Sequence, residues 1–310
     1  MPTKPVLEYL SRNQEKGLHD LLSYLSLTIE EVVNYSSRVF SSVLDKISLN
    51  YEDIPIILMY RNIFEILDAI STLIRESCIV PCSMLLRSAL ETFLGLLYLL
   101  EKDSEVRGRD CLVWERHQKL KSLRRFDPKD SLHVQFIKAK ERDVIGRGLP
   151  IPDVSDIETQ LEKIKQLFKI PELQDSVDEY ERYQNNHNGE IPKHWYSLRG
   201  GPASARKLAS HLNFPYQYEV LYSSWSKAVH GTDIMDNFSS ETPNKASFMP
   251  LRSPSSAPEA TTIAINLGLS SIRNLTAHYI PHLSKENAAW YRKEVQAANE
   301  KIAKLKITVL

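Results

Sequence analysis

Glycine, cysteine and uninterrupted apolar sequence are all scarce in this chain, and each shortage excludes a class of protein. Ten of the 310 residues are glycine, and alternating β-branched runs bounded by the turn pairs that connect strands do not occur. A sheet-rich fold is therefore not expected. The three cysteines, Cys78, Cys82 and Cys111, are too few for a disulfide framework and are typical of a reducing compartment.

Charge of one sign is not in excess either. The chain has 39 Lys and Arg residues and 39 Asp and Glu residues, so its formal net charge is zero. This balance argues against attraction of the whole molecule to nucleic acid or anionic lipid, while a local basic patch stays compatible with it. The N-terminal segment lacks the apolar core of a secretory signal. We therefore expect a cytoplasmic protein.

The two most apolar stretches, residues 54–74 and 82–100, are interrupted by charged side chains. Arg87 and Glu91 interrupt the second stretch, and three charged residues interrupt the first. A membrane-spanning helix needs about 20 apolar residues without such charges. Both stretches are therefore expected to be buried helices of a soluble protein, and no membrane partner is expected.

Apolar residues recur at intervals of three and four along most of the chain, which is the period of an α-helix. The sequence therefore predicts an all-α helical bundle that forms one domain over residues 1–310. Two long stretches rich in turn formers, 185–202 and 239–258, are expected to be loops. Helices are predicted over residues 6–27, 29–47, 53–77, 81–102, 105–125, 129–141, 155–168, 172–184, 203–212, 216–230, 260–281 and 284–306.

Polar residues form a stripe on the apolar segment 79–100. Ser83, Arg87, Glu91 and Gly95 are spaced by four, which places Arg87 and Glu91 on one helix face, close enough to pair. Because isolated buried charges are costly, we expect both to be paired or hydrogen-bonded. The stripe indicates a functional site; the alternative is a structural bridge that ties helices together.

A second polar stripe lies in the segment VLYSSWSKAVHGTD, residues 220–233. Tyr222, Ser226 and His230 are again spaced by four and share one face of a predicted helix. If the two stripes face each other, they form a pocket that contains a cation, a carboxylate, hydroxyls and an imidazole. The alternative for His230 is a capping or core histidine.

These motifs resemble those of a large bacterial all-helical family of uncharacterised proteins. The matching segments are R-S-A-L-E at 87–91, H-W-Y at 194–196, R-K-L-A at 206–209 and Y-x-x-x-S-x-x-x-H-G at 222–231. The resemblance covers roughly residues 55–281 and implies a family-like core there, with helices in 6–47 and 284–306 packed on it. Members of the family are often found near phage-defence genes, and they resemble the HEPN superfamily of helical bundles.

The HEPN resemblance implies a metal-independent ribonuclease that acts as a homodimer. The usual HEPN signature is Arg followed by His after four to six residues, and His230 has no arginine at that spacing. Arg87 would have to take that place from another helix. Pairs with the signature spacing do occur elsewhere, at Arg182/His187, Arg206/His211 and Arg273/His278.

Metal-free cleavage of an RNA phosphodiester needs proton transfer and positive charge at the phosphate. Histidine titrates near neutral pH and can act as acid or base, and a guanidinium can bind two phosphate oxygens. We therefore assign proton transfer to His230, phosphate binding to Arg87 and orientation of Arg87 to Glu91. Ser226 and Tyr222 would hydrogen-bond the substrate or the histidine.

Other chemistries are less well supported by the sequence. Ser226 with His230 lacks the G-x-S-x-G elbow of a serine nucleophile. His187, His194 and His230 match no zinc spacing, so no metal is expected, and neither is a cofactor.

Two further regions could contact RNA. The basic segment 115–126 contains Arg124 and Arg125, and it is the main candidate surface for binding the phosphates of an RNA backbone. Trp195 and Arg199 in the long loop could stack on a base, or the loop could instead pack against the bundle.

The sequence thus predicts a defence- or stress-associated ribonuclease or nucleotide-handling enzyme. Its expected partners are RNA or a nucleotide, together with a second copy of the chain or another subunit of a defence system. The alternative is a non-catalytic subunit that senses a ligand or binds a partner with the same pocket. A third reading makes the polar stripes a purely structural network.

Overall fold

The chain has an all-α fold that is divided into two compact units. The computed structural model describes residues 6, 10, 15–152, 154–222, 238–242, 245–248 and 250–307. Unit 1 comprises residues 1–49, 56–102 and 205–310, and unit 2 comprises residues 50–55 and 103–204. The sequence predicted a single domain over residues 1–310 and did not anticipate this division.

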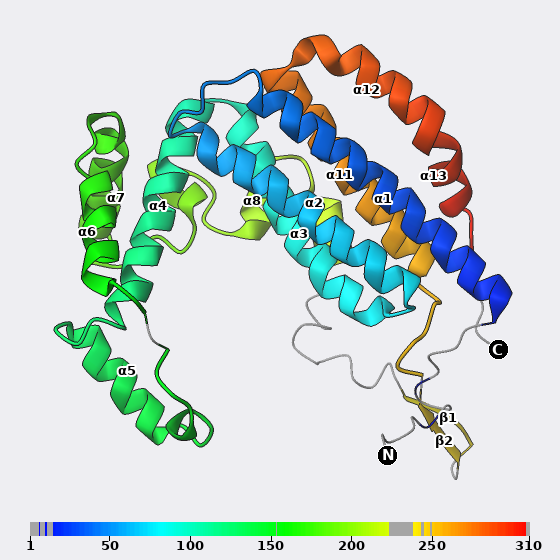
Figure 1. The fold of residues 1–310 in the computed structure, drawn as a ribbon, viewed down its shortest axis with the longest axis horizontal. Helices are drawn as coiled ribbons and strands as arrows, with labels where there is room; N and C mark the ends of the chain where they lie inside the picture. Colours follow the sequence, from blue (N-terminus) through cyan, green and yellow to red (C-terminus); the bar gives the residue numbers. More distant parts are fainter. Residues whose placement is uncertain are drawn as a thin grey trace. The chain divides into compact units, whose positions relative to one another are not determined.

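Unit 1 is a bundle of long helices. Helices α1 (Lys16–Leu44), α2 (Asp53–Arg75, in unit 1 from Ile56 onward), α3 (Ile79–Glu101) and α11 (Ala257–Tyr279) run side by side (Figure 1). α11 has its most extensive contacts with α1 and α3. A Cβ atom at Gly268 of α11 would lie 2.6 Å from Val32 Cγ1 and 2.9 Å from Leu67 Cδ1, so this glycine allows three helices to approach closely.

Helix α1 is continuous where the sequence predicted two helices, 6–27 and 29–47. Leu25, Ile29 and Val32 are fully buried and continue one apolar stripe across the predicted break. The Thr28 hydroxyl donates to the carbonyl of Tyr24 at 2.9 Å, and neither Gly nor Pro occurs between Leu18 and Leu44. The prediction of a break was therefore wrong, and α1 begins at Lys16.

The C-terminal part of unit 1 is interrupted where one helix was predicted over 284–306. The short 3-10 turn η6 (Pro281–Leu283) leads into α12 (Ser284–Trp290), a π-helical turn η7 (Tyr291–Val295) and α13 (Gln296–Ile302). The Trp290 ring stacks on Tyr35 of α1 at 3.8 Å between ring centroids, and its indole N–H donates to Glu31 at 2.7 Å. These contacts attach α12 to α1.

The rest of unit 1 is made of short elements. They are α8 (Ala205–His211), α9 (Pro215–Gln217), the π-helical turn η4 (Tyr218–Tyr222) and a two-stranded antiparallel hairpin of β1 (Phe238–Thr242) and β2 (Lys245–Phe248). The hairpin corrects the prediction that 239–258 is entirely a loop. Phe238 pairs with Phe248 across it, with ring centroids 5.7 Å apart.

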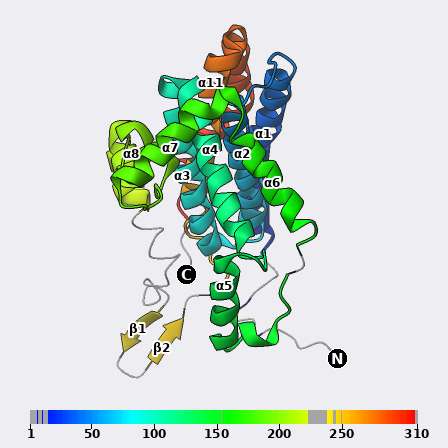
Figure 2. The same cartoon turned by 90° about the vertical axis from the view of Figure 1, so that its left-hand side faces the viewer.

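Unit 2 consists of shorter helices, among them α4, α6 and α7 (Figure 2). Its elements are α4 (Ser104–Arg124), α5 (Ser131–Arg142), η1 (Gly146–Gly148), α6 (Ile157–Leu167), η2 (Pro171–Leu173), α7 (Gln174–Asn186) and η3 (Trp195–Gly200). The larger apolar core comprises Leu112, Val113, Leu173, Val177 and Tyr180, and a smaller one comprises Leu123, Leu161 and Ile164. Most predicted helix boundaries in this unit lie within about two residues of the observed ones.

Helix α3 carries the most apolar sequence. Of the helices that the structure describes, it is the one long and apolar enough to cross a membrane by length and composition, and half of its apolar window is buried inside the protein. The core helix of a soluble protein has the same properties, and Leu86, Leu90 and Leu94 of α3 are nearly inaccessible in unit 1. The arrangement is consistent with a soluble protein.

Candidate functional site

Arg87 and Tyr222, one residue from each of the two polar stripes predicted from the sequence, are in contact in unit 1. The Arg87 side chain comes from α3, and one of its Nη atoms donates to the Tyr222 hydroxyl at 2.5 Å. Its Nε atom donates to Glu91 Oε1 at 3.2 Å, one helical turn away. The Arg87 guanidinium carbon also lies 4.2 Å from the centroid of the Tyr222 ring, within the range of a cation–π contact.

This site is less buried than the apolar sequence of α3 suggested. The side chain of Arg87 is 19% exposed and that of Glu91 is 43% exposed. The expectation of a helix surrounded by protein on every side is therefore wrong for this face. A half-exposed carboxylate keeps part of its hydration, so the pair costs less to form than a buried one and contributes little to stability.

Tyr218 extends the site on the side of Tyr222. The two phenol rings are stacked, with centroids 4.3 Å apart and planes inclined by 15°. Burial, with the neighbouring Tyr222 hydroxyl as the next cause, raises the pKa of Tyr218 to about 12. Tyr218 is therefore a neutral hydrogen-bond donor at physiological pH. We refer to Arg87, Glu91, Tyr218 and Tyr222 as the Arg87 cluster.

A second ion pair lies next to the cluster. Arg206 of α8 binds both carboxylate oxygens of Glu219, Oε1 at 3.1 Å from Nε and Oε2 at 3.3 Å from one Nη. Arg206 also acts electrostatically on Tyr218, where it lowers the pKa against the larger effect of burial. The other member of this signature pair, His211, binds Glu101 at 2.9 Å instead.

Tyr218 and Glu219 were missed by the sequence analysis, although a signal for Tyr218 was present. Tyr218 stands four residues before Tyr222 and therefore continues the stripe formed by Tyr222, Ser226 and His230. The helix predicted over 216–230 starts at Pro215 and becomes a π-helical turn at Tyr218–Tyr222. Such turns are frequent at functional sites. Ser226 and His230 lie outside the residues that the structure describes.

Arg199 belongs to unit 2 and is engaged there by carboxylates. Its guanidinium binds Asp110 at 2.8 and 3.1 Å and Asp175 at 2.6 Å, and its backbone N–H donates to Glu179 at 2.8 Å. The Asp110 side chain is only 5% exposed. A buried carboxylate needs a partner of this kind. In the structure Arg199 neutralises this buried acid within unit 2.

Trp195 is also part of the unit 2 interior. Trp195 is 7% exposed, the neighbouring Tyr196 is 9% exposed and Leu198 is 3% exposed. An indole covered to this extent has no free face for a nucleobase, so base stacking by Trp195 is not supported. The loop at 185–202 adopts the alternative arrangement, in which its aromatic residues pack against helices, and it includes the short helix η3.

Arg124 and Arg125 lie at the exposed C-terminal end of α4 in unit 2. Arg124 binds Asp130 at 2.6 Å, and that pairing lowers the pKa of the Asp130 carboxyl. Asp130 also caps α5 by accepting the N–H of Leu132 at 2.8 Å. Lys119 and Lys121 on the preceding turn are exposed as well, so the end of α4 is a solvated basic surface.

Two of the three histidines considered as metal ligands, His187 and His194, have other surroundings in the structure, and His230 lies outside the described residues. The Nδ1 atom of His187 lies 2.8 Å from the carbonyl oxygen of Tyr183, and the His194 ring stacks on Tyr196. In the part of the chain that the structure describes, His, Cys, Asp and Glu side chains do not gather in groups of three or more that could hold a metal ion.

Comparison with known proteins finds a family without an assigned function. Residues 53–246 match the profile described as "Family of unknown function (DUF5677)". The matched segment contains the whole Arg87 cluster and nearly all of unit 2, while α1, α11, α12 and α13 lie outside it. No curated protein and no solved structure matches the chain. The match spans more than half of the 310 residues, so the chain belongs to this uncharacterised family.

Proposed function

We propose that the protein is a metal-independent enzyme of phosphodiester chemistry, a ribonuclease or a nucleotide-handling enzyme, with its active site at the Arg87 cluster. The observation that carries the proposal is the contact between Arg87 and Tyr222. This contact joins the polar stripe of α3 to the segment that leads within eight residues to His230. Two regions separated by more than 130 residues thus contribute to one polar site.

In this proposal Arg87 binds the phosphate. Glu91 and Tyr222 hold the guanidinium plane from two directions, one through Nε and one through Nη. A phosphate oxygen would displace the half-exposed Glu91 carboxylate or share Arg87 with it, because arginine offers five donors in a fixed plane. The guanidinium of Arg87, already held in position, would then stabilise the negative charge that develops on the phosphorane-like transition state.

Proton transfer is assigned to His230, with Ser226 as its hydrogen-bonding neighbour. Tyr218 supports this division of roles because its raised pKa keeps it protonated. A neutral phenol donates a hydrogen bond to Tyr222 or to substrate without releasing its proton near neutral pH. The general acid and base would then be an imidazole, whose ordinary pKa lies near 6.5.

The basic end of α4 is the proposed contact for the rest of an RNA chain. Arg125 and the Lys119–Lys121 turn are exposed, and such a surface binds phosphates in a salt-dependent, sequence-independent way. We also propose that the protein is cytoplasmic, that it acts in defence or stress, and that it forms a homo-oligomer or binds a partner subunit, as the resemblance implies.

The test is cleavage of total RNA and of a labelled oligonucleotide in the presence of a chelator. The variants are His230→Ala and Arg87→Met, matched to the wild type for melting temperature. Arg61→Met is the control, because Arg61 also forms an i,i+4 pair with a glutamate, Glu65, at 3.1 Å on an exposed helix face. We expect cleavage by the wild type and Arg61→Met and at least a 100-fold loss in the other two.

Cleavage that survives in both His230→Ala and Arg87→Met would refute the assignment. If neither the wild type nor the variants cleave RNA, the change in melting temperature on addition of nucleotides tests the alternative, a ligand-sensing subunit. A nucleotide that raises the melting temperature of the wild type and not of Arg87→Met would identify a ligand-sensing subunit.

A further inference from the structure

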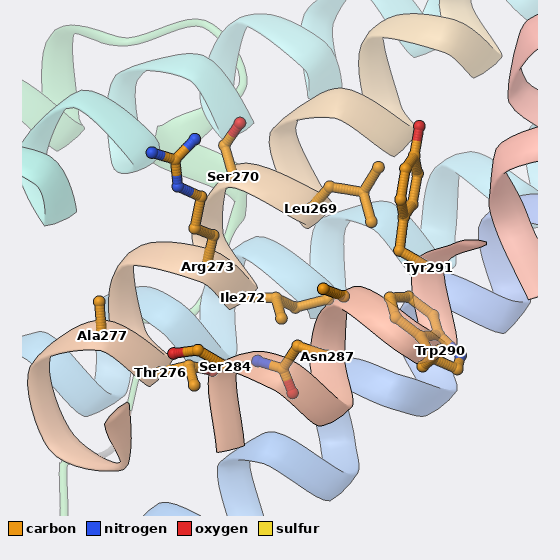
Figure 3. Close-up of a pocket in the computed structure, with 11 residues that line it drawn as sticks. Leu269, Ser270, Ile272, Arg273, Thr276, Ala277, Ser284, Asn287, Trp290 and Tyr291 are labelled. Atoms are coloured by element: carbon orange, nitrogen blue, oxygen red, sulfur yellow. Dashed lines mark hydrogen bonds between the residues drawn. The ribbon is translucent and has the colours of Figure 1, made fainter. Parts of the chain in front are cut away.

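Unit 1 contains a cavity of about 560 Å³ between α11 and the α12–η7 segment (Figure 3). Its volume is within the range of about 300–1,000 Å³ that is typical of small-molecule sites. The cavity is formed by residues 269–291 and therefore lies outside the segment 53–246 that matches the family. It shares no residue with the Arg87 cluster, so nothing in this inference depends on the proposed function.

The apolar wall of the cavity is held in place by contacts to the bundle. Leu269, Ile272 and Trp290 line it. The Trp290 indole is fixed by its stack on Tyr35, at 3.8 Å, and by its hydrogen bond to Glu31. A wall that is already ordered loses little conformational entropy when a ligand binds, which favours affinity.

The polar groups on the inner wall are already used within the protein. The Asn287 amide accepts from the Tyr35 hydroxyl at 2.7 Å and donates to the Thr276 hydroxyl at 2.7 Å. These two bonds use one acceptor site and one donor of the amide and hold this part of the lining in place.

One cation stands at the edge of the cavity. Arg273 is the single charged residue among those that line the cavity. It makes no ion pair or hydrogen bond with any residue that the structure describes, and it is solvent-exposed. Figure 3 shows Arg273 and Ser270 on adjacent turns of α11, beside Leu269 and Ile272, with Tyr291 on the opposite wall. A guanidinium, a hydroxyl and a phenol thus surround an apolar floor.

We propose that this cavity binds a small amphiphilic anion, meaning a carboxylate or phosphate attached to an aromatic or aliphatic body. The apolar body would lie against Trp290 and Ile272, where its burial is favourable. The anionic group would bind Arg273 with a charge-assisted hydrogen bond, and the Ser270 hydroxyl can donate a second one. An inorganic anion lacks the apolar body and a neutral ligand lacks the charge, so both bind more weakly.

The test uses 1-naphthyl phosphate as the probe in isothermal titration calorimetry with the full chain. Inorganic phosphate and 1-naphthol serve as the two half-ligands. We expect saturable binding of 1-naphthyl phosphate and binding at least tenfold weaker for each half-ligand. Arg273→Met should weaken binding about tenfold or more, since it removes a hydrogen bond between charged partners, and Arg273→Lys should retain part of the affinity.

A second variant tests the cavity itself. Ala288→Phe places a large side chain at an exposed position of the lining and should block the probe without disturbing the core. Arg61→Met is the control for loss of an exposed arginine elsewhere on unit 1 and should bind as the wild type does. Absence of saturable binding by the wild type would overturn the proposal. Unchanged affinity in Arg273→Met or in Ala288→Phe would overturn it as well.

Discussion

Replacement of Arg199 by alanine should destabilise unit 2 by about 2–4 kcal/mol. Removal of one partner of a fully buried ion pair costs about 3–5 kcal/mol, because the other charge stays buried and unpaired. The Asp110 side chain, 5% exposed, meets that condition, whereas Arg199 is 31% exposed. Water can therefore reach part of the gap, and we lower the expected cost accordingly.

The same guanidinium provides an internal control. Asp175 binds Arg199 at 2.6 Å, yet its side chain is 78% exposed. An exposed pair contributes about 0–1 kcal/mol, so Asp175→Asn should lower the free energy of unfolding by no more than that. Asp110→Asn should cost clearly more. Arg199 also has a left-handed backbone with φ of 53°, so Arg199→Gly should be about 1 kcal/mol less destabilising than Arg199→Ala.

The measurement is urea unfolding followed by tryptophan fluorescence and far-UV circular dichroism. Trp114 and Trp195 belong to unit 2, and Trp225 and Trp290 belong to unit 1, so a transition confined to unit 2 should change only part of the tryptophan signal. The reasoning is refuted if Arg199→Ala changes the free energy of unfolding by less than about 1 kcal/mol. It is also refuted if Asp175→Asn costs as much as Asp110→Asn.

Three further outcomes are expected. Burial lowers the pKa of His117 from 6.5 to about 4, so between these pH values only the unfolded chain binds a proton at this histidine. The free energy of unfolding should therefore fall by about 1–2 kcal/mol as the pH drops through that window. The variant His117→Phe, compared with the wild type at pH 4.5 and 7 by urea titration, should lose this pH dependence, and an unchanged dependence would contradict the assignment. Gly108→Ala should lower the melting temperature, because the added Cβ would lie 2.3 Å from the carbonyl oxygen of Glu52. The cost of overpacking, about 1–3 kcal/mol, exceeds the gain in helix propensity, about 1 kcal/mol. A higher melting temperature would show that this contact relaxes. Burial raises the pKa of Cys82 to about 12 and that of Cys111 well above its usual value, so iodoacetamide should modify both only after unfolding, as followed by mass spectrometry.

Local patterns predicted most of the helices and one half of the candidate site. The spacing of Arg87 and Glu91 indicated an ion pair, and the structure contains it at 3.2 Å. The contact between Arg87 and Tyr222 joins residues 135 apart in the chain, and the spacing rule did not predict it. Helical spacing is a property of adjacent turns, so residues three or four apart can be assigned to one face before the fold is known.

Other features of the site depend on residues far apart in the chain. Trp195 and Arg199 are residue types that often contact nucleic acids, but the fold buries Trp195 and pairs Arg199 with Asp110 of α4. The hairpin of β1 and β2 is built from polar sequence without alternation, and Phe238 pairs with Phe248 across it. Neither outcome has a local signature.

The sequence by itself thus determined the all-α class, the approximate extent of most helices and the pairing of Arg87 with Glu91 on one face, because each follows from the 3.6-residue period of one helix. Only the tertiary structure decided that α1 is continuous, that residues 103–204 form most of a second compact unit and that Arg199 neutralises a buried acid. It also revealed the cavity beside Arg273. These features depend on which helix faces are brought together, and that is set by the burial of apolar surface summed over the whole chain.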